Sequence, residues 1–133
     1  GTSTSAKYAD LAEKYTTDKH YEPGTVIVVS LDSTGAEATQ SFSNNQRIIG
    51  VVSTNPAHLM NSVLESEYAV AVALTGRVPT SVVGTVRKGD MMVSAGNGVA
   101  MASSAPTLGT VLGKALENFN GESGVIEIVV GRL

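Results

Sequence analysis

Short apolar runs separated by glycine make up most of this chain. Runs of this length, bounded by turn-forming residues, are typical of β-strands. The pattern predicts strands over residues 25–31, 36–42, 47–53, 69–75, 78–83, 90–94, 98–102, 109–116 and 124–132. Asn-Gly at 97–98 and 120–121 and Ser-Thr-Gly at 33–35 are typical of tight turns, because glycine adopts a positive φ at low cost. The sequence therefore predicts an all-β fold.

Two segments have helical spacing instead. In "AKYADLAEKY" the residues Tyr8, Leu11 and Tyr15 recur at i, i+3 and i+7, which forms one apolar stripe on a helix. "NPAHLMNSVL" begins with Asn55 before Pro56, a combination typical of a helix N-terminus. We expect one or two short helical turns.

The glycines also predict an internal repeat. Each copy has a glycine before its first strand, a second in a turn and a third in the middle of a later strand. These are Gly24, Gly35 and Gly50 in one copy and Gly89, Gly98 and Gly113 in the other. A glycine within a strand marks a bulge, a bend or a close backbone approach. The expected architecture is a β-barrel or a β-clip-like fold built from duplicated three-strand units.

Residues 69–74 alternate strictly between alanine and larger apolar residues. Ala69, Ala71 and Ala73 share one face of the predicted strand, and the larger residues share the other. An alanine face allows another backbone to come close. It is typical of a tightly packed interior, and it also suits a subunit contact near a symmetry axis.

Composition restricts the class of protein. The 133 residues suit one domain, over 8–133, with residues 1–7 as a linker or expression remnant. Only 16% of residues are charged and the net charge is −3, without a basic stripe, which argues against nucleic-acid binding. There is no cysteine, and no apolar run reaches the length of a membrane span. Low charge is compatible with burial of surface in an oligomer.

Candidate chemistry is sparse. His20 and His58 are the only histidines and lack carboxylates at ligand spacing, so we expect no metal site, and no glycine-rich loop predicts a cofactor. Asp10 and Glu13 would share a face if their segment is helical. Two adjacent carboxylates can share a proton and supply one acid and one base. The alternative is that they form the solvated side of a helical turn.

The chain also resembles a known family. The segments "YADLAE", "GVVSTNPA" and "GRVPTSVVGTVRKGD" are similar to the C-terminal β-domain of phage tail-fibre and appendage proteins, in particular to the autocleaving chaperone domain of phage neck appendages. The resemblance spans Tyr8 to Leu133. It implies a virion protein that forms a homotrimer at the end of a fibre shaft. In the autocleaving relatives it implies cleavage near Ala6–Lys7 with Asp10 and Glu13 as catalytic residues, although "SAK" replaces the expected Ser-Asp junction.

From these observations we predict a structural, trimerising tip of a viral fibre or appendage, which could contact the host surface. We expect no catalytic residue, metal or cofactor. The expected contacts between subunits are Ala69, Ala71, Ala73, Tyr8, Leu11 and Tyr15. Two alternatives stay open. One is a self-cleaving chaperone domain that uses Asp10 and Glu13. The other is a ligand-binding module whose binding surface is loop 53–67.

Overall fold

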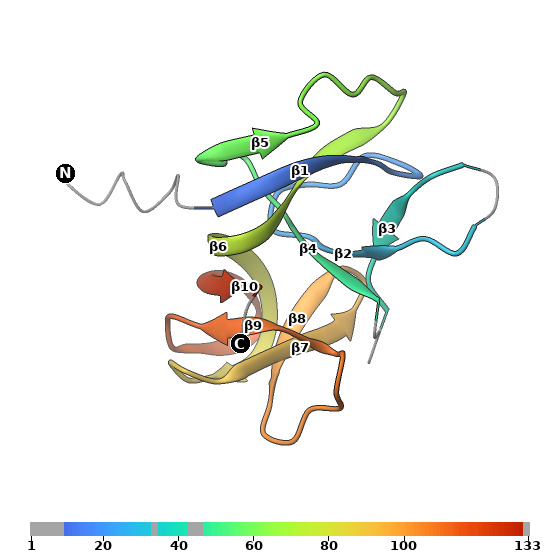
Figure 1. The fold of residues 1–133 in the computed structure, drawn as a ribbon. Helices are drawn as coiled ribbons and strands as arrows, with labels where there is room; N and C mark the ends of the chain where they lie inside the picture. The colour runs from blue at the N-terminus through green and yellow to red at the C-terminus, as the bar shows by residue number, and fades with distance from the viewer. Residues whose placement is uncertain (1–9, 33–34, 43–46, 132–133) are drawn as a thin grey trace.

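The computed structural model describes residues 10–32, 35–42 and 47–131. Within these ranges all regular structure is β, as predicted, and the long strand β6 runs through the middle of the fold (Figure 1). The strands are β1 (Asp10–Thr16), β2 (Val26–Val29), β3 (Ala38–Gln40), β4 (Ile48–Val52), β5 (His58–Met60), β6 (Ala69–Val86), β7 (Met91–Gly96), β8 (Val99–Ser103), β9 (Val111–Ala115) and β10 (Phe119–Val130).

Strand β6 belongs to two closed rings of five strands. Its second half pairs with β10, and the ring continues through β9, β7 and β8 and returns to β6 by a parallel bridge between Val82 and Ala100. Its first half pairs with β1 and β4. That ring continues through β2 and β3 and closes by a parallel bridge between Ala38 and Thr17, which directly follows β1.

The two rings have the same strand connections and the same registers. Tyr15 of β1 pairs with Val70 of β6, as Thr80 of β6 pairs with Ile126 of β10. The register between β2 and β4 shifts after Ile27, and the register between β7 and β9 shifts after its counterpart Met92. We call residues 10–75 the first repeat and residues 76–131 the second repeat.

The duplication was predicted, but its unit is larger than expected. The predicted unit corresponds to β2, β3 and β4 in one copy and to β7, β8 and β9 in the other, and these do superimpose in topology. Each repeat adds a strand before and a strand after this unit. The full extent of the repeat was not visible in the sequence, because the two predicted strands 69–75 and 78–83 are one continuous strand. This strand ends one repeat and begins the next.

Both predicted helical segments are wrong in the described residues. The first is strand β1, which lies between β6 and β5 and exchanges hydrogen bonds with both. The second contains strand β5 followed by a turn at 61–63: the Ala57 N–H donates to the Asp10 carbonyl over 2.8 Å, and β5 then runs parallel to β1. Pairing within a sheet outweighs the weak helical preference of a short segment. Tyr8, the first residue of the predicted stripe, lies outside the described residues.

Each ring encloses a hydrophobic core, and the two cores match position by position. The buried residues of the first core are Tyr21, Ile27, Ala38, Val52, Val70 and Val72. Their counterparts are Val86, Met92, Ala100, Ala115, Ile126 and Ile128, all of which belong to the second core; the match of Tyr21 to Val86 follows from its position in the sequence and the others from strand register. Val26, Val51 and Ala73 of the first repeat also pack into the second core and join the two. The two repeats therefore share their core packing as well as their topology.

The predicted turns divide into two groups. Gly98 has φ 76°, its neighbour Asn97 has φ 51° and Gly35 has φ 135°, so these turns use the left-handed region as predicted. The Asn120–Gly121 pair is not a turn, because it lies within β10 and pairs with Thr85 and Gly84 of β6.

Candidate functional site

Strand geometry separates the two carboxylates that the sequence placed together. Asp10 and Glu13 lie three residues apart on β1, and side chains of a strand alternate between its faces, so the two point to opposite sides. Glu13 accepts a 3.0 Å hydrogen bond from the hydroxyl of Tyr15, its neighbour on the same face. The helical face on which the paired-carboxylate hypothesis depended is not present. The peptide near Ala6–Lys7 lies outside the described residues.

Asp10 nevertheless has an unusual environment. It is only 2% exposed, and its Oδ2 atom is buried without a hydrogen-bond partner among the described residues. Its backbone is fixed on both sides, by pairing with Gly76 of β6 and by the Ala57 N–H. A buried polar atom without a partner is uncommon and costs stability, which makes it a candidate for function.

Glu127 on β10 is a half-buried carboxylate with a shifted pKa. Burial is the main cause that raises the pKa of Glu127 above its ordinary value. Its ion pair with Arg77, at 3.7 Å, lowers the pKa, and the negative charges of Glu117 and Asp10 raise it further. The sequence analysis did not single out Glu127, because the ion pair with Arg77 forms only through the pairing of β10 with β6.

The residues predicted to make subunit contacts are brought close together on β1 and β6. Lys14 pairs with Ala71 and Thr16 pairs with Ala69 across the two strands. Ala73 is fully buried within the chain, whereas Ala69 and Ala71 keep part of their surface. Leu11 and Tyr15 are half-buried, and Tyr15 packs against the first core.

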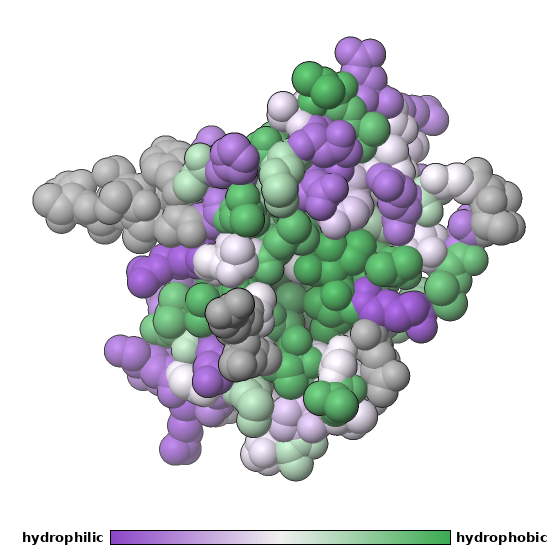
Figure 2. All heavy atoms as spheres, in the orientation of Figure 1, coloured by the Kyte–Doolittle hydropathy of each residue, from purple (hydrophilic) through white to green (hydrophobic). Residues whose placement is uncertain are grey.

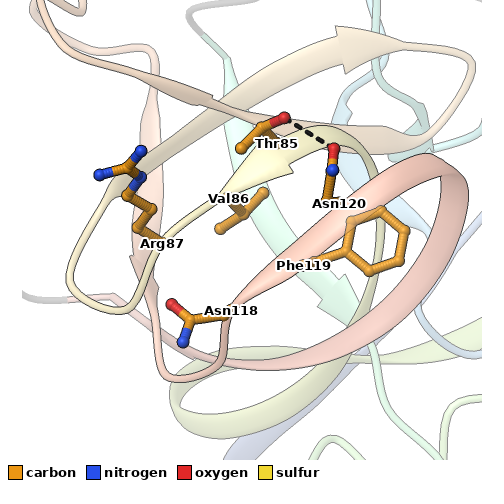
Figure 3. Close-up of a pocket in the computed structure, with 6 residues that line it drawn as sticks. All are labelled: Thr85, Val86, Arg87, Asn118, Phe119 and Asn120. Atoms are coloured by element: carbon orange, nitrogen blue, oxygen red, sulfur yellow. Dashed lines mark hydrogen bonds between the residues drawn. The ribbon is translucent and has the colours of Figure 1, made fainter.

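An open pocket of about 540 Å³ lies at the far end of β6 and the start of β10. It is lined by Thr85, Val86, Arg87, Asn118, Phe119 and Asn120. In Figure 3 the Thr85 hydroxyl donates to the Asn120 side-chain oxygen, over 2.9 Å, and Arg87 points away from the pocket. Apart from the Thr85 hydroxyl, the side chains that line this pocket include no group that could act as an acid, a base or a nucleophile.

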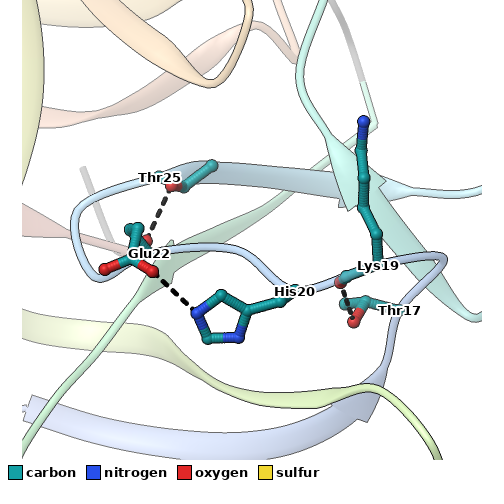
Figure 4. A network of polar contacts seen from close by, with 5 residues as sticks. All are labelled: Thr17, Lys19, His20, Glu22 and Thr25. Atoms are coloured by element: carbon teal, nitrogen blue, oxygen red, sulfur yellow. Dashed lines mark hydrogen bonds and ion pairs between the residues drawn. The ribbon is translucent and has the colours of Figure 1, made fainter.

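The histidines take part in surface contacts. His20 lies 2.7 Å from Glu22 in the loop before β2, and the Thr25 hydroxyl donates to the Glu22 carbonyl (Figure 4). His58 lies on β5 and is exposed. Among the described residues no group of histidine and carboxylate side chains could hold a metal ion, and no helix is long and apolar enough to cross a membrane.

A further surface was missed in the sequence. Val29, Leu31 and Phe42 are exposed large apolar residues around a pocket of about 350 Å³ at the outer end of β2 and β3. We call these three residues the apolar tip. Figure 2 shows hydrophobic side chains on this end of the molecule, on the right of the view. Their counterparts in the second repeat are small or polar, namely Ser94, Gly96 and Ser104. Comparing the two copies could have revealed this surface.

The fold is similar to those of bacteriophage appendage proteins. A C-terminal fragment of the bacteriophage phi29 gene product 12 matches with a TM-score of 0.67 and 15% identity, over 92% of this chain and all of that one. The pre-mature gene product 12 of the same phage matches with a TM-score of 0.69 and 16% identity over 94% of this chain. This chain spans 22% of the length of that protein.

A third structure, the N base of the phi29 head fiber gp8.5, matches with a TM-score of 0.59 and 12% identity, over 90% of this chain and 92% of that one. No protein-family model matches the sequence, and no curated protein matches it either. At these identities the similarity establishes a shared fold.

Proposed function

We propose that this chain is a structural domain of a phage virion, and that it forms a homotrimer in a fibre or appendage. The observation that carries the proposal is the match of nearly the whole chain to three phage appendage and head-fibre structures. The low charge of the chain supports a structural function. In this proposal residues 8–133 form one domain attached to a fibre shaft, with the host surface as a further possible partner.

The decisive measurement is the mass of the chain in solution. Sedimentation equilibrium at about 50 µM should give three times the chain mass of 13.7 kDa. A monomer at that concentration would contradict the proposal.

The alanine face provides a mutational test of the same proposal. Ala71→Glu would place a charge in a dry contact and should dissociate the trimer into folded monomers, because an unpaired buried charge costs several kcal/mol. Ser123→Glu, at an exposed position of β10, is the matched control and should leave the mass unchanged. An unfolded Ala71→Glu chain would assign this face to the interior of the monomer.

Self-cleavage is a second candidate, favoured by one observation. Within the part of the chain that the structure describes, the buried Oδ2 of Asp10 has no hydrogen-bond partner, and Asp10 lies at the start of β1, close in sequence to Ala6–Lys7. A longer chain with its native upstream residues would then split into two during expression, and Asp10→Asn would prevent the splitting. Because Glu13 faces the other side of β1, Glu13→Gln should not prevent it. If mass spectrometry finds the longer chain intact, self-cleavage is excluded and the structural function is the candidate that remains.

A further inference from the structure

We draw no further inference here: the strongest candidate, the open pocket at the end of β6 and the start of β10, carries nothing, because its polar side chains are exposed, Thr85 and Asn120 bond to each other, Arg87 points away from it, and nothing in the structure shows what would occupy it.

Discussion

Gly50 and Gly113 occupy the same place in the two repeats. A Cβ atom added to Gly50 would lie 1.9 Å from the carbonyl oxygen of Ala73 on β6, and one added to Gly113 would lie 2.0 Å from that of Val129 on β10. Real Cβ atoms do not approach a backbone atom so closely. Each repeat therefore requires glycine at this position to bring its fourth strand against its last.

We expect Gly50→Ala and Gly113→Ala to destabilise the chain by similar amounts, about 3 kcal/mol each, because a backbone strand must move in both cases. Urea unfolding measures the effect. Gly121→Ala is the matched control, since its nearest neighbour, at 3.1 Å, is the end of the Phe119 side chain and not a backbone atom. A loss below about 1 kcal/mol at either repeat position would contradict the equivalence of the two sites.

The Asn97–Gly98 turn carries a second prediction. Both residues have positive φ, which is the signature of a tight two-residue hairpin turn. Asn97→Gly should change stability by only a few tenths of a kcal/mol, whereas Asn97→Val should cost about 1–2 kcal/mol, because a β-branched side chain resists this conformation. Thermal unfolding compares the two variants. Equal melting temperatures would show that the turn does not hold its backbone conformation in solution.

The sequence was sufficient for the fold class and for the duplication. Both follow from local signals: short apolar runs with glycine between them, and glycines such as Gly50 and Gly113 that recur at matching distances from turns. The extent of the repeat was not visible, because β1 and β10 occupy matching positions only through their pairing to β6. Pairing between distant strands leaves little trace in local periodicity.

The candidate sites show the same limit. Asp10 and Glu13 were placed on one face because the spacing of Leu11 and Tyr15 suited a helix. In a strand the two side chains point to opposite faces. The ion pair of Glu127 with Arg77 depends on the pairing of β10 with β6 and could not be predicted from spacing. The apolar tip could have been predicted by comparing the two copies, since Leu31 of the first aligns with Gly96 of the second. That comparison needs the register that the structure supplies.

Tyr21 provides a third prediction. Its hydroxyl donates to Asp18 over 2.7 Å and contacts the Thr39 hydroxyl at 3.0 Å, while its ring lies in the first core. Tyr21→Phe should cost about 1 kcal/mol, because the ring stays and only the hydrogen bonds are lost. Burial, as the largest cause, raises the pKa of Tyr21 above its ordinary value of 10.0. Ultraviolet titration should therefore lose a late-titrating phenol in this variant.

A variant that keeps every late-titrating phenol would contradict this assignment. Tyr15 has a raised pKa as well, through burial and its hydrogen bond to Glu13. Tyr15→Phe is thus the control that accounts for the other late signal.

The last prediction concerns pH and Glu127. Burial raises the pKa of this carboxyl above its ordinary value of 4.5, so the folded chain holds the proton more tightly than the unfolded chain. The resulting stability is fully present below the unfolded pKa and is lost as pH rises through the folded pKa. The Glu127→Gln variant has no carboxyl proton to release at this position, so this contribution to its stability does not change with pH. Relative to the wild type, the unfolding free energy of this variant should therefore improve as pH rises from about 4 to about 7.

Arg77→Gln should act in the opposite direction. Arg77 lowers the pKa of Glu127, so its removal raises that pKa further and moves the loss of stability to higher pH. Urea unfolding across this pH range measures both effects, with Glu122→Gln on the same strand as the control for removing one negative charge. Parallel curves for the wild type and Glu127→Gln would show that Glu127 ionises as freely in the folded chain as in the unfolded one.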